Sequence, residues 1–317
     1  MSIKDLESLL TSSTIEKWNQ SRIKNIVILQ GNEEWAWHER GRDDAHALYS
    51  CTKSILSALI GIAIEKGQLA SVELPLATFF PETRDDLDER KRNITIKHLL
   101  TMTSGMDWPE FDKPYRDMRK ALDWTDYVLG RPMAHEPGST FAYNSGGSHL
   151  LSRVLNQVTG LDVLDYARTN LFSIIGMKSP AWKSNKGTRE GGAGLFMNAK
   201  DLAKFGLLYL QEGVWNGERV LSESWINEST RVRTRGLVNY VPKIYGQYGY
   251  HWWISPKEDN GYIDYFFAFG YGGQYMFVVP QLNLVTVVRK ALAGRNNAIL
   301  SREVFHHDLL KIFLDKK

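Results

Sequence analysis

The residues Ser50-Cys51-Thr52-Lys53 place a hydroxyl group and an amine at a spacing that suits nucleophilic catalysis. They open an apolar stretch, residues 50–66, whose pattern predicts a buried helix that ends at Gly67. Residues three apart on a helix share a face, so the side chains of Ser50 and Lys53 are expected to meet. The backbone N–H of Ser50 lies free at the positive end of the helix dipole and can donate to an oxyanion. Lys53 can take the hydroxyl proton if desolvation or nearby cations lower its pKa from about 10.4.

The Ser-x-x-Lys pattern also occurs at Ser21-Arg22-Ile23-Lys24. That second copy lies in a charged stretch just before a predicted strand, whereas Ser50 opens a helix that can be held rigid. The alternative for Ser50 is a helix N-cap. Cys51 points about 100° away from Ser50 around the helix, and we interpret it as a packing residue.

A second segment, residues 137–147, is a turn-rich loop that contains Tyr143, Asn144 and Ser145 and precedes a predicted helix over residues 148–158. Tyr143 can act as a general base or acid if a nearby cation favours the phenolate. The alternative is a tyrosine whose ring is packed and whose hydroxyl faces water.

A third segment, residues 269–274, contains Gly270, Gly272 and Gly273 and enters a predicted strand. Glycines allow a ligand to approach the backbone closely, and an edge strand can donate N–H groups to a substrate carbonyl. The alternative is a glycine-rich β-bulge.

Several elements must position these segments. We expect an amphipathic helix over residues 2–20, strands over 26–30 and 34–38, and a helix over 201–211. The last third predicts consecutive antiparallel strands over 248–254, 263–269, 275–279 and 284–289, followed by a helix over 296–315. The order predicts an α+β fold: residues 1–67 and 190–317 form a sheet region, residues 68–189 an inserted helical region, and the cleft lies between them.

Composition narrows the function classes. The chain has 317 residues, of which 43% are apolar and 24% charged, and its formal net charge is +3. It is therefore neither a disordered chain nor a disulfide scaffold, and nothing favours nucleic acid as a partner. Charges interrupt the N-terminal stretch and residues 55–64 are too short to span a bilayer, so we expect a cytoplasmic protein that does not bind membranes.

Other catalytic classes lack their motifs. There is one cysteine and no HExxH, GxSxG or Walker pattern, so we expect neither a metal site nor a cofactor. His98 and His149 lie inside helix patterns and are interpreted as structural. Four tryptophans are candidates for the wall of a pocket: Trp108, Trp124, Trp252 and Trp253.

Taken together, the order and spacing of the three segments resemble the serine β-lactamase and penicillin-binding-protein superfamily. The branch with class C β-lactamases, DD-peptidases, family VIII esterases and 6-aminohexanoate-dimer hydrolase is the most similar. The resemblance runs from about residue 24 to the C-terminus, and further stretches typical of the branch are residues 94–105, 171–172 with 176–177, 191–195 and 201–206.

This resemblance implies a β-lactamase/transpeptidase-like fold and a role for each matching residue. Ser50 would form an acyl-enzyme, Lys53 would keep its hydroxyl ready to lose a proton, and Tyr143 would share the base role and protonate the leaving group. The backbone N–H groups of Ser50 and Gln274 would form the oxyanion hole. The residues implied to bind substrate are Asn144, Ser145, Tyr271, Gly272 and Gly273.

Two departures from the family pattern bear on the substrate. The second motif is often Tyr-x-Asn, and here its third position is Ser145. The third motif is Lys-Thr-Gly in β-lactamases, and here Tyr271-Gly272-Gly273 takes its place, which removes a cation able to meet a substrate carboxylate. We therefore expect an esterase or amide hydrolase that acts on a small molecule or a short peptide-like substrate. The alternatives are a β-lactamase or D-amino-acid peptidase, and a ligand-binding protein without turnover; the oligomeric state stays open.

Overall fold

The computed structural model describes residues 3, 6, 10–108, 113–178, 180–292 and 299–314. Its centre is an eight-stranded antiparallel sheet in the order β10-β11-β12-β13-β14-β15-β1-β2. The bounds of these strands, in chain order, are β1 Ile23–Gln30, β2 Glu33–His38, β10 Thr234–Arg235, β11 Gln247–Tyr248, β12 Trp253–Ser255, β13 Tyr265–Gly270, β14 Gln274–Val279 and β15 Leu284–Lys290.

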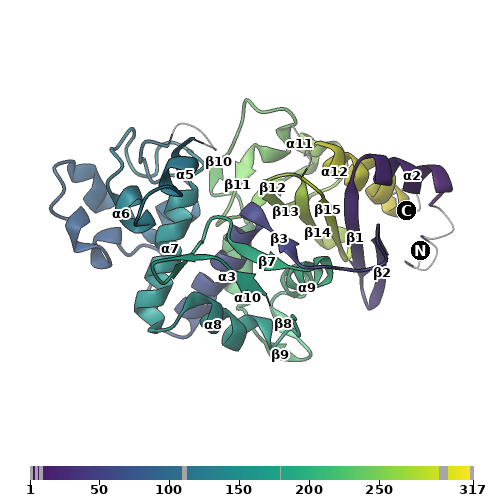
Figure 1. Ribbon diagram of the computed structural model, residues 1–317, viewed down its shortest axis with the longest axis horizontal. Coiled ribbons are helices and arrows are strands. Elements are labelled where there is room, and N and C mark those ends of the chain that lie inside the picture. The colour runs from purple at the N-terminus through teal and green to yellow at the C-terminus, as the bar shows by residue number, and fades with distance from the viewer. Residues whose placement is uncertain are drawn as a thin grey trace.

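Strands from both ends of the chain meet in this sheet. β1 pairs with β15 in a register that places Gln30 opposite Leu284, and β2 completes that edge as the hairpin partner of β1. The prediction of a sheet built from both ends, with a helical insertion, is therefore confirmed. Figure 1 shows the helices between residues 113 and 159 gathered at one end of the molecule and the sheet toward the other.

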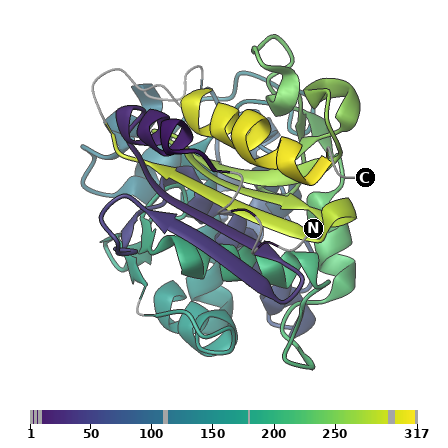
Figure 2. The ribbon, with the colours of Figure 1, turned by 90° about the vertical axis from the view of Figure 1, so that its right-hand side faces the viewer.

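Helices cover both faces of the sheet. α9 (Ala199–Leu210) packs on β1, β14 and β15 from one side. On the other side, α2 (Ser12–Gln20) and the C-terminal helix lie across the strands, as Figure 2 shows. The side chains of β14 alternate between the two cores, with Tyr275 and Phe277 on the face of the C-terminal helix. Because both faces of the sheet are buried, the sequences of the central strands are nearly continuous runs of apolar residues.

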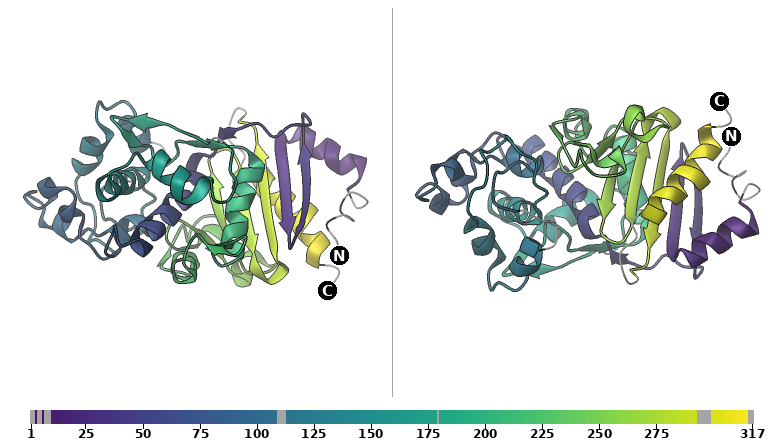
Figure 3. Two further views of the ribbon diagram at one scale, coloured as in Figure 1. Left: turned by 90° about the horizontal axis from the view of Figure 1, so that it is seen from below. Right: turned by 90° about the horizontal axis from the view of Figure 1, so that it is seen from above.

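The remaining helices mostly form the other end of the molecule. α3 (Thr52–Glu65) packs against α7 (Ser145–Thr159) between the sheet and the outer helices (Figure 3). The shorter helices are α4 Ile96–Leu100, α5 Lys113–Met118, α6 Trp124–Leu129, α8 Val163–Ala167, α10 Glu223–Thr230, α11 Lys257–Asn260, α12 Ile299–Glu303 and α13 Lys311–Leu314. The short strands pair in three small sheets: β3 His46–Ala47 and β4 Ala181–Trp182 flank β7 Leu195–Met197; β5 Ser184–Asn185 pairs with β6 Thr188–Arg189; β8 Val214–Trp215 pairs with β9 Glu218–Arg219.

Three predicted elements differ from the structure. The single strand expected over 248–254 is two strands, β11 and β12, because His251 turns the chain with a φ of +61° and its N–H donates to Leu100 O at 3.0 Å. The helix expected from residue 148 begins at Ser145, because the Asn144 side chain caps it. Of the helix expected over 2–20, the structure shows α2 from Ser12, and residues 1–2, 4–5 and 7–9 lie outside the described part.

The C-terminal helix follows its prediction with one addition. α12 and α13 are joined by a π-helical stretch, Val304–Leu310, which packs on β15. Residues 296–298 and 315 of the predicted span lie outside the described part. Within the ranges that the structure describes, no helix combines the length and the apolar character that a membrane crossing requires.

Candidate active site

Ser50 lies in a short 3₁₀ turn, Tyr49–Cys51, that leads directly into α3. Lys53 is in the first turn of α3, and its Nζ atom lies 3.0 Å from Ser50 Oγ. The two side chains therefore meet as their spacing predicts. Tyr49, just before the nucleophile candidate, has a φ of +49°, in a left-handed region that a bulky residue rarely occupies. Such local strain is typical of sites where the surrounding structure fixes a reactive group.

The Lys53 amine is buried among neutral acceptors. Besides Ser50 Oγ, Nζ contacts Ser145 Oγ at 3.0 Å and donates to the carbonyl oxygen of Gly192 at 2.7 Å. Burial lowers the pKa of Lys53 to about 7, and the negative charge of Glu190 acts in the opposite direction. A substantial fraction of Lys53 is therefore a neutral amine near pH 7, as a base requires.

Tyr143 is packed against the same amine. Lys53 Nζ lies 4.8 Å from the centroid of the Tyr143 ring, and the ring stacks on Trp253 at 5.7 Å. Burial raises the pKa of Tyr143 above its usual range, while a hydrogen bond with Ser50 acts to lower it. The phenol is therefore protonated at neutral pH and suited to give a proton rather than to hold an anion.

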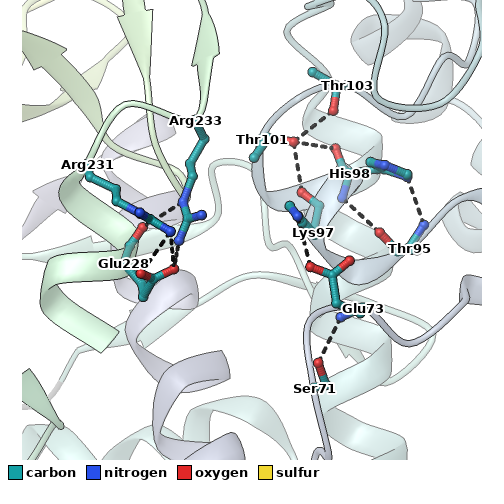
Figure 4. A network of polar contacts seen from close by, with 10 residues as sticks. All are labelled: Ser71, Glu73, Thr95, Lys97, His98, Thr101, Thr103, Glu228, Arg231 and Arg233. Atoms are coloured by element: carbon teal, nitrogen blue, oxygen red, sulfur yellow. Dashed lines mark hydrogen bonds and ion pairs between the residues drawn. The ribbon is translucent and has the colours of Figure 1, made fainter. Parts of the chain in front are cut away.

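The loop that carries Tyr143 is held by the segment after α4. Ala142 N donates to Met102 O at 2.8 Å, and Gly138 N donates to Thr103 O at 2.7 Å. α4 itself begins with a capping box in which the side chains of Thr95 and His98 cap each other's backbone N–H (Figure 4). Residues 94–105 are one of the stretches that are typical of the family branch. These contacts indicate their physical role, which is to hold the Tyr143 loop in place.

The third segment is the turn of the β13–β14 hairpin. Gly270 and Gln274 face each other across its end, and Gly272 and Gly273 have positive φ. Contrary to the edge-strand expectation, β14 is an interior strand between β13 and β15. Tyr271 is 48% exposed and packs edge-to-face on Tyr49 at 5.7 Å. This turn therefore lies beside the residue that precedes Ser50.

One hydrogen bond and one close approach of two backbones show that the segment around Ser50 lies directly against this hairpin. Cys51 Sγ donates to Gln274 O at 3.5 Å, and a Cβ atom on Gly270 would lie only 2.2 Å from Leu48 O. Gly270 is thus required by the close approach of the two backbones. Cys51 is fully buried and its pKa is raised to about 12 by burial, so its thiol is not a nucleophile at neutral pH.

Of the two residues that follow Tyr143, only one contacts the catalytic candidates. Ser145 reaches Lys53, as described above. Asn144, which we expect to bind substrate, is instead buried at 2% exposure, and its Oδ1 accepts from Gly147 N at 2.9 Å as the N-cap of α7. We interpret Asn144 as a residue that orients α7, and through it Ser145.

Sequence reasoning missed three features around this cluster. The Gly192 carbonyl that accepts from Lys53 is a backbone group and leaves no side-chain signal. His251, buried and with its pKa lowered to about 3 by burial, contacts Ser148 Oγ through Nε2 at 3.0 Å. Arg289 is 1% exposed on β15, and an arginine within an apolar strand is a signal that could have found it.

Arg289 links three segments around the site. Its guanidinium donates to Gln274 Oε1 at 3.3 Å, to Met197 O at 2.8 Å and to Ala47 O at 3.4 Å. Burial lowers the pKa of Arg289 to about 10, so the side chain remains a cation at neutral pH. It therefore fixes the Gln274 side chain and places a positive charge behind the start of β14.

The competing Ser-x-x-Lys pattern has no such environment. Ser21 caps the C-terminus of α2, and Lys24 forms an ion pair with Glu39. In the described part of the chain, no three His, Cys, Asp or Glu side chains gather in a group that could hold a metal. Trp108 and Trp253 lie at or behind the Tyr143 loop, whereas Trp124 packs on His149 and Trp252 on Phe205.

Comparisons with known proteins agree with this architecture. A 6-aminohexanoate-dimer hydrolase from Paenarthrobacter ureafaciens is 25% identical over 287 residues, which cover 83% of this chain and 71% of that protein. A Bacillus anthracis structure named "Putative 6-aminohexanoate-dimer hydrolase" superposes with a TM-score of 0.80 at 20% identity, covering 95% of this chain and 82% of the other. A D-stereospecific amidohydrolase from Streptomyces sp. gives 0.72 at 16% identity, with 97% and 99% covered.

These structures share the β-lactamase/transpeptidase-like fold that the sequence motifs imply. The family model described as Beta-lactamase matches residues 25–297, which include Ser50, Lys53, Tyr143 and Gln274. The chain thus belongs to the Beta-lactamase family, a family of hydrolases.

Proposed function

We propose that this protein is a serine hydrolase that cleaves an ester or amide of a small molecule through an acyl-enzyme on Ser50. The observation that carries the proposal is the contact between Ser50 Oγ and a buried Lys53 amine whose pKa is about 7. An exposed lysine with an ordinary pKa would be protonated at neutral pH and could not accept the hydroxyl proton.

The three contacts of Lys53 indicate how its neutral amine can accept the proton of Ser50. A carbonyl oxygen can only accept, so one N–H of Lys53 is committed to Gly192. A neutral amine has one further N–H, which can go to Ser145 Oγ, and one lone pair, which then faces Ser50. The protonated amine would instead use a donor on each of the three oxygens. Deprotonation of Lys53 thus turns the contact with Ser50 into one that accepts the hydroxyl proton.

Acylation then balances as follows. The Ser50 Oγ–carbon bond forms, and the bond from the carbonyl carbon to the leaving oxygen or nitrogen breaks. The Ser50 proton passes to Lys53, Tyr143 gives its phenolic proton to the leaving atom, and Lys53 returns a proton to Tyr143. The backbone N–H groups of Ser50 and Gln274 are proposed to hold the oxyanion, a contribution of about 3 kcal/mol for each donor. Water then hydrolyses the acyl-enzyme by the reverse proton transfers.

Two observations support the proposed substrate class, one from the hairpin turn and one from a relative. Tyr271 offers no cation to a substrate carboxylate, which favours neutral esters and amides over penicillins and peptidoglycan peptides. The Paenarthrobacter ureafaciens relative is named for hydrolysis of a 6-aminohexanoate dimer. Turnover of a chromogenic cephalosporin at rates equal to those for simple esters would favour the β-lactamase alternative instead.

The test is covalent labelling with a fluorophosphonate, followed by intact mass and a peptide map. We expect one adduct on Ser50, none in Ser50→Ala, and at least tenfold slower labelling in Lys53→Ala. Ser21→Ala is the matched control, because it removes the serine of the competing pattern, and it should label like the wild type. An adduct at Ser21, or ligand binding with no adduct at all, would contradict the proposal and favour a binding protein.

A further inference from the structure

A cavity of about 290 Å³ opens against Tyr143. Its lining comes from residues 106–108, the loop 134–143 and Leu237, with no contribution from the β13–β14 hairpin. Six of the lining residues are apolar: Met106, Trp108, Ala134, Phe141, Ala142 and Leu237. The cavity thus lies on the Tyr143 side of Ser50, apart from the turn that carries Gln274.

The walls of this cavity are held by packing and by backbone hydrogen bonds. Phe141 packs edge-to-face on Tyr248 at 5.3 Å and lies 6.0 Å from Trp253, the ring on which Tyr143 stacks. Ala134 N donates to Gly105 O at 2.8 Å. A wall built on such contacts is formed before a ligand arrives, which lowers the entropic cost of binding.

The cavity lining contains one carboxylate, that of Asp107, and one imidazole, that of His135. The Asp107 carboxylate pairs with Arg131 at 2.9 Å, and Arg131 Nε also donates to Asp107 O at 3.0 Å. An ammonium group in the cavity would have to compete with Arg131 for this carboxylate, and a carboxylate group would face Asp107 itself. The imidazole of His135 is exposed to solvent, so it is not a buried partner for a charged group. The described lining therefore favours an uncharged ligand.

The volume sets the size of that ligand. An apolar cavity of about 150 Å³ is known to take up benzene, so about twice that volume accommodates a group near the size of two fused rings. Six apolar lining residues, two of them aromatic rings, suit such a group. A short unbranched alkyl group would leave much of the cavity unfilled.

Resting on the proposed function, we propose that this cavity is the leaving-group subsite, and that it selects an uncharged aromatic or branched apolar alcohol or amine. Tyr143 indicates that the cavity receives the leaving group and not the acyl group, because Tyr143 lines the cavity and shares a hydrogen bond with Ser50. The group that departs must take its proton from Tyr143, so it leaves toward the cavity, while the acyl group stays on Ser50.

Two matched ester series test which half of the substrate the cavity holds. The first varies the alcohol: methyl, benzyl and 2-naphthylmethyl acetate. The second varies the acid: methyl acetate, methyl phenylacetate and methyl 2-naphthylacetate. We expect kcat/KM to rise at least tenfold along the alcohol series and less than threefold along the acid series. A 4-carboxybenzyl or 4-(aminomethyl)benzyl acetate should lose at least tenfold relative to benzyl acetate. A rise along the acid series, or no difference between charged and neutral alcohols, overturns the proposal.

A filling variant tests the cavity itself. Ala134 is exposed at the cavity, and Ala134→Leu should reduce the ratio of kcat/KM for 2-naphthylmethyl over methyl acetate at least tenfold. Ala70→Leu makes the same change at an exposed position outside the lining and should leave the ratio unchanged. An equal ratio in Ala134→Leu and the wild type contradicts the cavity as a subsite.

Binding of the product alcohol separates this proposal from the proposed function. Calorimetry with 2-naphthylmethanol should show binding to the wild type and at least tenfold weaker binding to Ala134→Leu. If Ser50 is not labelled by fluorophosphonate, the proposed function fails whatever the alcohol does. If Ser50 is labelled but the alcohol does not bind, the leaving-group subsite fails and the proposed function stands.

Discussion

Lys53 donates a hydrogen bond of 2.7 Å to the carbonyl oxygen of Gly192, a residue 139 positions further along the chain. Together with the contacts to Ser50 Oγ and Ser145 Oγ, this hydrogen bond restrains rotation about the last bonds of the lysine side chain. The amine is thereby held at Ser50 with no carboxylate of the described residues in contact, and burial lowers its pKa.

The pH dependence of activity should follow Lys53. Because its pKa is lowered to about 7, kcat/KM for a neutral ester should rise about tenfold for each pH unit below that value and level off above it. The measurement is a profile from pH 5 to 9 with an uncharged substrate. If the rise of kcat/KM on the acid side of the profile (its acid limb) is centred near pH 4 or near pH 10, Lys53 is not the base.

Glu190 should set the position of that limb. Its buried carboxylate acts to raise the pKa of Lys53, accepts from the Tyr115 hydroxyl and is paired with Arg119 at 3.2 Å. Glu190→Gln keeps the shape of the side chain and removes the charge, so the acid limb should move to lower pH. Glu89→Gln, whose side chain is 80% exposed, is the control and should leave the profile in place. A shift to higher pH in Glu190→Gln would refute the argument.

Arg289 should affect turnover more than ground-state binding. Arg289→Met leaves Gln274 Oε1 and two carbonyl oxygens without their donor, at a cost of about 1–3 kcal/mol in stability for each buried group that stays unsatisfied. We expect kcat to fall at least tenfold with KM changed less than threefold, and partial recovery in Arg289→Lys. Arg40→Met, at a side chain that is 74% exposed, should match the wild type. A variant that loses stability but keeps its kcat would show a purely structural role.

Gly270→Ala should impair catalysis through the backbone. The added Cβ would lie 2.2 Å from Leu48 O and would force the segment before Ser50 away from the hairpin. We expect a loss of fluorophosphonate labelling of at least tenfold in protein that remains folded by circular dichroism. Gly130→Ala is the comparison, since its φ is −73° and its nearest neighbour would be at 3.2 Å. Normal labelling of Gly270→Ala would show that this close approach is dispensable.

Stability in mild acid should depend on His251. Burial lowers its pKa to about 3 in the folded protein, against about 6.5 in the unfolded chain. Between these values the unfolded state binds more protons, so the free energy of unfolding should fall as the pH falls from 6.5 toward 3. His251→Gln should show a shallower fall than the wild type in thermal melts over this range. Equal slopes would exclude His251 as a contributor.

The parts of the site that the sequence predicts are those set by local geometry or by motif. Ser50 and Lys53 meet because they lie three residues apart at the start of a helix. The strands of the last third follow from apolar runs separated by glycine, asparagine and proline. Only the resemblance to the family links Tyr143 and Gln274 to Ser50, because their sequence distance from Ser50 carries no information on spatial distance.

The rest depends on the tertiary structure. The Gly192 carbonyl is a backbone group, and His251 turns a chain whose aromatic residues read as one strand. Asn144 carries a side chain suited equally to a substrate and to a helix N-terminus, and only the start of α7 decides between them. The direction of each tryptophan side chain is likewise fixed by packing: Trp108 lines the cavity, and Trp252 is buried against α9.

The pairing of β1 with β15 has a consequence for how the protein is made. The Gln30 side chain donates to Leu282 O, and 252 residues separate the two. At about 5–20 residues per second, a ribosome needs on the order of 10–50 s to cover that distance. During that interval the first hairpin has no neighbour on its β15 side, and the segment that contains Ser50 has no β13–β14 hairpin beside it. The first strands of the nascent chain are therefore an exposed edge that a chaperone can cover.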